Sequence, residues 1–361
     1  MCYIWKNPTD SREEVSLETL SKLPNGFSNL NISGGEPTLR RDLAELVDLL
    51  YPKARILEIS SNGLQPKKLI PIIKKYPNIK VRFSLEGDEA LSNAIRGEKN
   101  GYAKKVEGLL ALKEAGGTDL GFAIVIQDEN VAQLTEVYNM ACDMGFELST
   151  STLHNAWQFY KNDNYFYNRK TVARQVEGLI TAMLKTNNVK NWFRAYLNMG
   201  LIEKILGHPR LIPCTAGTDF AFIDPWSDVW ACNVRSDLPM GNLKEQSWDE
   251  IISNPTACNS IKQVKDCEQT CWMVTTARTA MRSKLFPKLP SAKPLNWVIK
   301  NKLRVTFGSK IPFSEYIDYN TATPTQQVKR VSFLNEKAKV KLKRDRNTVA
   351  ERYPLREFDN N

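Results

Sequence analysis

The hydrophobic and polar positions of the first half of the chain follow two alternating periods. Short β-rich runs are each followed by a segment in which apolar residues recur every three or four positions. The helical faces consist of Leu39, Leu43, Leu46, Val47 and Leu50 in one segment and Val131, Leu134, Val137, Tyr138 and Ala141 in another. The predicted strands are 30–33, 55–60, 79–85, 120–126 and 146–152. Repeated strand–helix units predict a parallel sheet buried on both faces, either open or closed into a barrel, with ligands at the carboxyl ends of its strands.

The pattern changes after residue 154. A polar aromatic stretch at 157–167 precedes two helices at about 169–187 and 191–206. A second unit then combines a hairpin, formed by 220–223 and 229–231, with helices at 248–264 and 272–285. Beyond Pro287 periodicity is lost, and we expect the last forty or so residues to be loosely ordered. The predicted divisions are 1–206, 207–286 and a basic tail at 287–361.

Composition places the chain among ordinary globular proteins. Its 361 residues are 42% hydrophobic and 25% charged, with no long apolar run and no signal pattern, which predicts a cytoplasmic protein without a membrane partner. Much of the net charge of +10 comes from basic residues at 337–346. We interpret this run as a solvated tail and expect no nucleic-acid partner.

The cysteines indicate metal chemistry. The chain has seven cysteines but only two histidines, and five of the cysteines lie between 214 and 271. Without a secretory signal, a disulfide framework is disfavoured. Metal ligation mainly by thiolates favours an iron–sulfur cluster or zinc over sites that need imidazole.

The first motif is Gly34-Gly35-Glu36-Pro37, which closes the first predicted strand. Two glycines allow a sharp turn and the close approach of a ligand, and a carboxylate can accept hydrogen bonds from an ammonium group. Taken alone, these residues favour an ordinary loop between strand and helix.

In its context, this motif resembles that of the radical S-adenosylmethionine (SAM) superfamily, in which a Gly-Gly-Glu-Pro turn lies some thirty residues after a Cys-x-x-x-Cys-x-x-Cys loop. Residues 1–6 resemble the end of such a loop, with Cys2 as its third cysteine. The resemblance implies a partial (β/α)6 TIM-like barrel lacking its first strand, followed by a small α+β cysteine-rich carboxyl-terminal domain. It also implies that Cys2 ligates a [4Fe–4S] cluster whose fourth iron binds SAM, and that Glu36 holds the amino group of SAM.

Three further segments extend the resemblance. The turn 60–63 is similar to the family's ribose-facing turn, 83–87 to its Ser-Leu-Asp-Gly strand ending, and 94–97 to a loop whose arginine approaches the cofactor carboxylate. The implied cofactor contacts are Gly34, Gly35, Glu36, Pro37, Ser61, Asn62, Ser84 and Arg96. A capping hydroxyl and a surface cation are the simpler interpretations of Ser84 and Arg96.

The chain departs from the family pattern in offering one thiolate where the loop needs three. We therefore expect that it does not hold the catalytic cluster by itself. A truncated gene model and a degenerate paralogue are both compatible with this departure. An upstream in-frame Cys-x-x-x-Cys would distinguish them.

The second motif consists of four cysteines, Cys214, Cys232, Cys267 and Cys271. The hairpin brings the first two together, and the set would suit either tetrahedral zinc or a [4Fe–4S] cluster. The segment resembles the SPASM extension in its shorter "twitch" form, which implies an auxiliary [4Fe–4S] cluster on these four residues.

Other candidate residues have structural interpretations. We expect Cys142 and Cys258 to be buried helix residues and His154 to be a hydrogen-bonded loop residue. The aromatic stretch at 157–167 is compatible with a substrate cleft and with helix packing.

The implied activity is reductive cleavage of SAM to a 5′-deoxyadenosyl radical, which abstracts hydrogen from a peptide, protein or small-molecule substrate. An external one-electron donor, such as flavodoxin or ferredoxin, is implied as a partner. The alternative is a non-catalytic iron–sulfur or zinc protein on the same fold.

Overall fold

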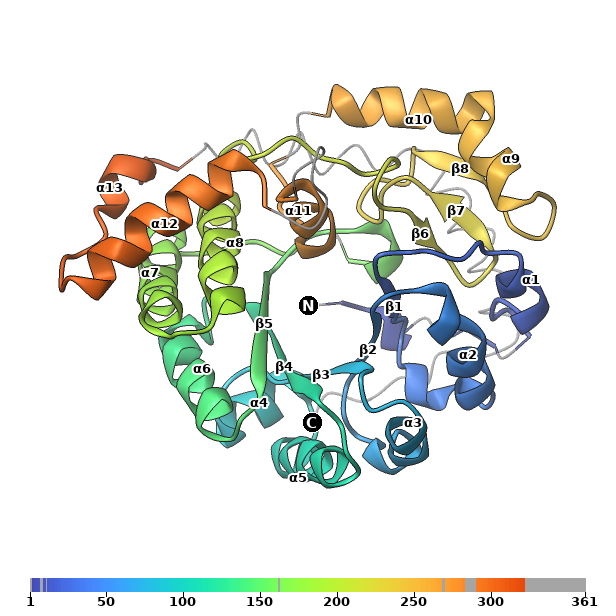
Figure 1. Ribbon diagram of the computed structural model, residues 1–361, viewed down its shortest axis with the longest axis horizontal. Helices are drawn as coiled ribbons and strands as arrows, with labels where there is room; N and C mark the ends of the chain where they lie inside the picture. Colours follow the sequence, from blue (N-terminus) through green and yellow to red (C-terminus); the bar gives the residue numbers. More distant parts are fainter. Residues whose placement is uncertain are drawn as a thin grey trace.

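The computed structural model describes residues 2–6, 9–10, 12–161, 163–267, 270–282 and 290–321. Five parallel strands form one sheet in the order in which they occur along the chain. The strands are β1 (Leu30–Ile32), β2 (Leu57–Ser61), β3 (Lys80–Ser84), β4 (Asp119–Ile126) and β5 (Glu147–Thr152). Every strand pairs with the next one, and the sheet is curved with its helices on the outside (Figure 1).

Helices cover the outer surface of the sheet. Those of the first part are α1 (Leu17–Ser21), α2 (Leu43–Leu50), α3 (Ile70–Lys75), α4 (Glu89–Arg96), α5 (Gly101–Glu114), α6 (Leu134–Asp143), α7 (Arg169–Lys185) and α8 (Val189–Leu206). Short 3-10 helices are η1 (Ile4–Lys6), η2 (Pro37–Leu39), η3 (Tyr51–Lys53), η4 (Pro66–Lys68), η5 (Val131–Gln133) and η6 (Trp157–Phe159). The chain is thus a partial TIM-like α/β barrel, and each of the five strands lies within two residues of its predicted bounds.

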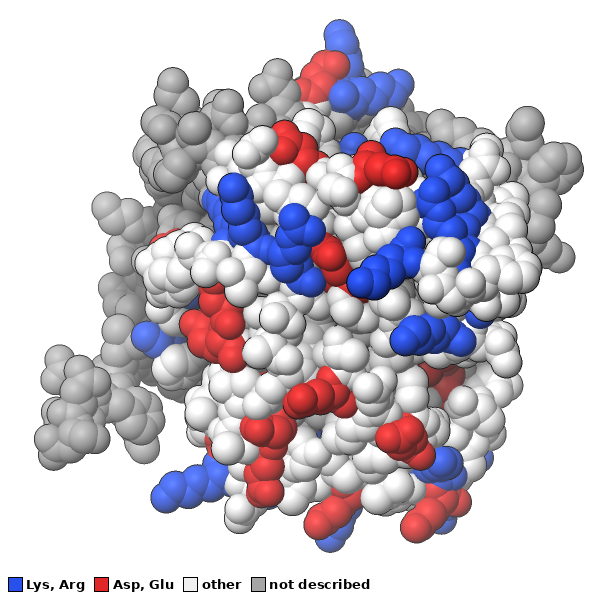
Figure 2. All heavy atoms as spheres, turned by 90° about the vertical axis from the view of Figure 1, so that its left-hand side faces the viewer, with Lys and Arg blue, Asp and Glu red and all other residues white. Residues whose placement is uncertain are grey.

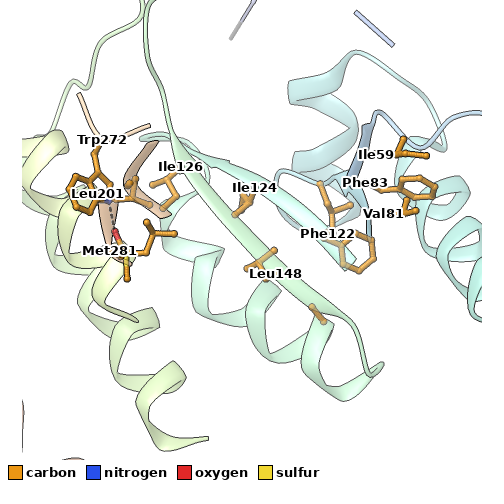
Figure 3. Packing of buried hydrophobic residues seen from close by; sticks show 14 of the residues in the cluster. Ile59, Val81, Phe83, Phe122, Ile124, Ile126, Leu148, Leu201, Trp272 and Met281 are labelled. Atoms are coloured by element: carbon orange, nitrogen blue, oxygen red, sulfur yellow. Dashed lines mark hydrogen bonds between the residues drawn. The ribbon is translucent and has the colours of Figure 1, made fainter. Parts of the chain in front are cut away.

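The two faces of the barrel strands differ in chemistry. Ser61, Phe83, Phe122 and Leu148 pair in one row across four strands, and this side is packed under the helices (Figure 3). The alternate residues face the barrel interior and include Glu58, Ser60, Lys80, Arg82 and Ser84. The outer face is thus apolar and buried, whereas the inner face is polar, buried at Glu58, Lys80 and Arg82 and partly accessible at Ser60 and Ser84.

A cysteine-rich unit follows the barrel. Its antiparallel sheet contains β6 (Phe222–Ile223), β7 (Asp228–Trp230) and β8 (Pro239–Asn242), and its helices are α9 (Trp248–Ser253), α10 (Pro255–Lys265) and α11 (Val274–Ala280). The predicted hairpin is confirmed by the pairing of β6 with β7. The predicted single helix at 248–264 is two helices, because Asn254 caps α10 and Pro255 has no N–H to continue α9.

The segment after Pro287 is more ordered than predicted. It contains α12 (Ala292–Thr306) and α13 (Phe313–Tyr316). Helix α12 packs on α7 and α8, and the Lys302 ammonium donates to the carbonyls of Leu184 and Thr186 at 3.0 Å each. Helix α12 was not predicted because its packing face contains polar residues, such as the fully buried Asn301, which interrupt the apolar helical period. The predicted loose order of the last forty residues, from 322 onward, lies outside the described residues.

The side of the molecule that carries α12 is charged. Figure 2 shows Lys and Arg side chains gathered in its upper part, with Asp and Glu interspersed below them. Several apolar residues of α12 and its C-cap are also exposed: Leu295, Ile299 and Leu303 in the helix and Phe307 at the C-cap. None of the helices in the described part of the chain has the length and apolar character needed to cross a bilayer.

Candidate active site and auxiliary metal centre

The Gly-Gly-Glu-Pro turn lies directly after β1, at the carboxyl-terminal edge of the sheet. Gly34 has a φ of +142°, in a region that favours glycine. A Cβ on Gly35 would lie 3.1 Å from Ile4 Cγ2, so the small residue lets the segment 2–6 pack against the turn. The segment that carries Cys2 therefore lies at the same edge of the sheet as Glu36.

The Glu36 carboxylate is held by four donors. Its Oε1 accepts from Thr38 N at 3.0 Å, Thr38 Oγ1 at 2.7 Å and Ser61 Oγ at 2.8 Å, while Oε2 accepts from Asn62 N at 2.6 Å. Glu36 also caps η2, in which Pro37 is the first residue. The structure thus brings Glu36, Ser61 and Asn62 together. Oε2 has the greater remaining capacity to accept a ligand's hydrogen bond.

The other two predicted contacts, Ser84 and Arg96, lie at the end of β3 and at the end of the following helix α4. Ser84 is the last residue of the strand and is half-buried. Arg96 ends α4, and its guanidinium pairs with the fully buried Glu86, whose other oxygen accepts from Val125 N at 2.9 Å. Arg96 is therefore occupied by a protein carboxylate, although its Nε is buried and has no partner within the described chain.

The loop after β5 contains several unpaired polar atoms. Among the described residues, the buried atoms Thr152 Oγ1, His154 Nε2, Trp157 Nε1 and Gln158 Oε1 have no hydrogen-bond partner. His154 Nδ1 lies 3.2 Å from Thr152 O, which confirms the predicted hydrogen-bonded loop histidine. Burial lowers the pKa of His154 to about 3, so the ring is neutral at neutral pH. Unpaired buried polar atoms at a strand end fit a polar ligand.

The aromatic stretch packs on the second unit rather than on a helix. The Trp157 ring centroid lies 5.0 Å from that of Trp230 and 6.4 Å from that of Phe222. Tyr165 and Tyr167, by contrast, are exposed. The backbone N–H of Tyr3 donates to Phe159 O at 2.7 Å, so this loop also contacts the segment that carries Cys2.

The four predicted sulfur ligands lie near one another. Burial, together with the neighbouring Cys271 and Cys214, raises the pKa of Cys232 to about 12. Burial also raises the pKa of Cys271, and Cys214 and Cys267 contribute in the same direction. These mutual effects mean that the four thiols share one small region.

The four thiols do not form a ready-made site for one metal ion. Among the described residues, no three Cys, His, Asp or Glu side chains surround a point that one metal ion could occupy. Zinc would require all its sulfur ligands within about 2.3 Å of one point. A [4Fe–4S] cluster binds each thiolate through a different iron and so accepts a wider arrangement.

Each of the four sulfurs has a donor beside it. Ala216 N donates to Cys214 Sγ at 3.5 Å, and Val234 N to Cys232 Sγ at 3.3 Å. Arg210 Nη1 lies 3.7 Å from Cys271 Sγ, and the Arg235 side chain is hydrogen-bonded to Cys267. Donors of this kind stabilise thiolates and tune the cluster that they bind. The donor set therefore fits an iron–sulfur cluster.

Two family models match the chain in the two regions just described. Residues 2–141 match the model of the radical SAM superfamily, and residues 214–273 match SPASM, the iron-sulfur cluster-binding domain. The chain belongs to the radical SAM superfamily. It carries a SPASM extension, as predicted, and both matches lie within the predicted divisions 1–206 and 207–286.

The radical SAM chain is similar to several known proteins. It is 29% identical to the mycofactocin maturase MftC of Mycolicibacterium smegmatis over 282 residues, which span 73% of this chain and 69% of that protein. Its fold resembles that of SuiB from Streptococcus suis, with a TM-score of 0.53 and 18% identity over 79% of this chain and 71% of that one. It also resembles anSMEcpe with bound AdoMet and a peptide, with a TM-score of 0.50 and 16% identity over 83% and 90% of the two chains.

The cofactors of this radical SAM protein are accordingly a [4Fe–4S] cluster, SAM and an auxiliary iron–sulfur cluster. Their ligands in this chain stay predictions: Cys2 for the first cluster and Cys214, Cys232, Cys267 and Cys271 for the second. The prediction that Cys142 and Cys258 are buried is wrong, because both side chains are exposed. In their helices the neighbouring Ala141 and Ala257 occupy the buried positions.

Sequence reasoning missed the residues that join the cluster unit to the barrel. The Trp272 ring lies against Gly200 of α8, where a Cβ would be 2.0 Å from Cε2, and its Nε1 donates to Leu197 O at 2.8 Å. Figure 3 shows Trp272 beside Leu201 and Met281. The only signal in the sequence was a tryptophan directly after Cys271.

A second contact joins α11 to the barrel interior. The Arg278 guanidinium lies 3.6 Å from the Glu58 carboxylate, which also accepts from Lys80 Nζ at 2.6 Å. The cluster unit is therefore in contact with both the outer helices and the inner face of the barrel.

Proposed function

We propose that this protein reductively cleaves SAM and uses the resulting radical to abstract hydrogen from a peptide or protein substrate. The observation that carries the proposal is the arrangement at the carboxyl-terminal edge of the sheet. There the Glu36 carboxylate is fixed by Ser61 and Asn62, beside the turn on which the segment of Cys2 packs. When bound, the cluster and SAM supply the electron and the radical.

The chain's own residues would bind and orient SAM and the substrate. Glu36 Oε2 would accept from the amino group of SAM, and the Ser61-Asn62-Gly63 turn would face its ribose. Glu36 follows β1 and accepts hydrogen bonds from Ser61 and Asn62 at the end of β2. Its carboxylate therefore needs little reorganisation to receive a ligand. The hydroxyls of Ser60, Ser84, Ser149 and Ser151 line the half-buried inner face and would contact the substrate.

A peptide substrate is supported by the comparisons. The protein whose fold resembles this one was solved with AdoMet and a peptide together, and the relative MftC is named a maturase. The interior of the barrel is partly accessible along its polar face. An extended peptide substrate could place one of its residues in the barrel interior while the rest of the peptide lies outside.

The auxiliary cluster would be held by Cys214, Cys232, Cys267 and Cys271. Its proximity to Trp272, which packs on α8, and to Arg278, which reaches Glu58, would place it beside the barrel interior. Such a cluster could accept the electron left on an oxidised product or could anchor the second unit.

The test measures SAM cleavage directly. Because the chain as given supplies one of the three loop thiolates, the protein is produced together with any in-frame sequence encoded upstream of Met1. It is reconstituted anaerobically with iron and sulfide and given dithionite or a flavodoxin, and release of 5′-deoxyadenosine is quantified. We expect Glu36→Gln and Cys2→Ser to abolish it and Cys258→Ser, an exposed cysteine, to leave it unchanged. If the chain holds the auxiliary cluster but releases no 5′-deoxyadenosine, the non-catalytic alternative is supported instead.

Peptide specificity is tested separately. Candidate peptides encoded next to the gene are incubated with the active protein and SAM, and their masses are compared before and after. A mass change that requires SAM and Glu36 supports a peptide substrate. SAM cleavage that is stimulated only by small metabolites would contradict it.

A further inference from the structure

A buried lysine lies under the turn that follows β2. Lys105 belongs to α5, and its side chain is almost wholly buried, with 1% of the residue exposed. Its stem passes directly beneath Gly63, which has a φ of +74° and where a Cβ would be 2.9 Å from Lys105 Cγ. The lysine thus reaches the carboxyl-terminal edge of the sheet from the helix layer.

No hydrogen bond or ion pair to the Lys105 ammonium occurs within the described part of the chain. The acidic groups near it are bonded elsewhere: Glu86 by Arg96 and Val125 N, and Glu98 by Lys104 Nζ at 2.9 Å. Burial, with a smaller contribution from the neighbouring Arg96, lowers the pKa of Lys105 to about 8, although Glu86 and Glu98 oppose the change. The group is therefore still mainly charged at neutral pH.

Glu86 and Glu98 only partly compensate this buried cation, because neither is hydrogen-bonded to it, and the arrangement therefore favours an anionic ligand. The Arg96 guanidinium is already paired with the buried Glu86 carboxylate, so only part of it is left to bind such a ligand. Within the cluster formed by Lys105, Arg96 and Glu86, Lys105 is the cation that lacks a partner. Its position beside the Ser61-Asn62-Gly63 turn brings it to the edge where SAM would bind.

We propose that Lys105 binds the carboxylate of SAM, taking the role that family resemblance gives to Arg96. This inference rests on the proposed function, because it requires SAM to bind at this edge. Lys105 is thereby a cofactor-binding residue, while Arg96 positions Glu86 and the end of β4 through the bond from Val125 N.

The experiment compares two ligands by equilibrium dialysis on the same reconstituted protein, produced with any in-frame sequence encoded upstream of Met1. One ligand is SAM and the other is decarboxylated SAM, which lacks only the carboxylate. We expect the unaltered chain to prefer SAM by tenfold or more. Lys105→Met should weaken SAM binding by about tenfold and leave the affinity for decarboxylated SAM unchanged, so that the preference disappears.

The matched controls are Lys104→Met, an adjacent cation bonded to Glu98, and Lys105→Arg, which keeps the charge. Both should retain a preference for SAM. Thermal unfolding provides a readout of folding: in the absence of ligand, Lys105→Met should match or exceed the melting temperature of the unaltered chain, because a desolvated charge is removed.

The outcomes separate the two proposals. If the unaltered chain prefers SAM and Lys105→Met keeps the same preference, the assignment of Lys105 is overturned and the proposed function stands. Equal weakening of both ligands would show a structural role and would also overturn it. Failure of the unaltered chain to bind SAM would refute both proposals.

Discussion

The barrel edge and the cysteine-rich unit are prepared for their ligands in opposite ways. At the barrel edge, Glu36 is already bonded to Thr38, Ser61 and Asn62, so the site keeps its shape through protein contacts alone. In the second unit, burial and the neighbouring thiols raise the pKa of Cys232 and Cys271, so deprotonation of these thiols is costly until a metal centre binds the thiolates. We infer that protein contacts alone shape the site at the barrel edge, whereas the fold of the cysteine-rich unit depends on its bound cofactor.

The largest expected effect comes from removing the metal. We expect iron-free protein to lose hydrogen-exchange protection across residues 214–273 while strands β2 to β4 keep theirs. Structural metal centres contribute on the order of 10 kcal/mol to the folding of small domains. Exchange measured by mass spectrometry on iron-free and reconstituted chains checks this, and equal protection of the second unit in both states would refute a cofactor-dependent fold.

The next effect concerns the contact between the two regions. Trp272→Ala removes the ring that packs on Gly200 and should lower the free energy of unfolding by about 3–5 kcal/mol in urea titrations. Gly200→Ala should act in the same direction, because its Cβ would overlap the ring. The control is Trp5→Ala, whose side chain is 66% exposed. Equal losses for Trp5 and Trp272 would mean that the packing does not hold the regions together.

A smaller effect tests the pre-formed edge itself. Glu36→Gln presents an amide where the carboxylate now accepts on both oxygens, so a donor such as Asn62 N loses its acceptor. We expect a loss of about 1–3 kcal/mol in urea unfolding, together with weaker SAM binding. Glu98→Gln, at a half-exposed ion pair, is the matched control. Unchanged stability in Glu36→Gln would show that the edge is not held by this carboxylate.

The strands were predictable because they carry a strong local signal. Val81 and Phe83 alternate with Lys80 and Arg82, and this alternation follows the pleat of a strand whose outer face is buried. The inner-face partners were not predictable, because the pairing of Arg82 with Asp119 and Glu147 depends on the register between strands far apart in sequence. Helix α12 was missed for a different reason, since Asn301 is polar but buried.

The candidate site was predictable only in part. The motif residues Glu36, Ser61 and Asn62 come together as the resemblance implied. Lys105 was missed, although the sequence held a signal: it lies four residues before Leu109 on the buried face of α5, where a charge is unusual. Arg96 as a cofactor contact stays a prediction, and its motif position did not reveal that Glu86 pairs with its guanidinium.

The smallest effect concerns the opposite edge of the barrel, at the amino ends of the strands. Burial opposes ionisation of Asp119, but the Arg82 guanidinium beside it lowers the carboxyl pKa to about 2. Because the folded-state pKa is depressed, its contribution to stability is complete above about pH 4 and is lost as the pH falls toward 2. Partial exposure screens this contribution, which we expect to be about 1–2 kcal/mol.

Asp119→Asn should therefore lower the stability of the protein at pH 7 and flatten its loss of stability between pH 4 and pH 2, measured by urea unfolding at each pH. Asp48→Asn, at a well-exposed ion pair with Lys75, is the control and should change little. The iron content after reconstitution should be unaffected, because Asp119 stabilises the floor of the barrel and not the cluster unit. A variant that lost its auxiliary cluster would show instead that the two regions fold as one, and that the second site is shaped by the barrel as much as by its metal.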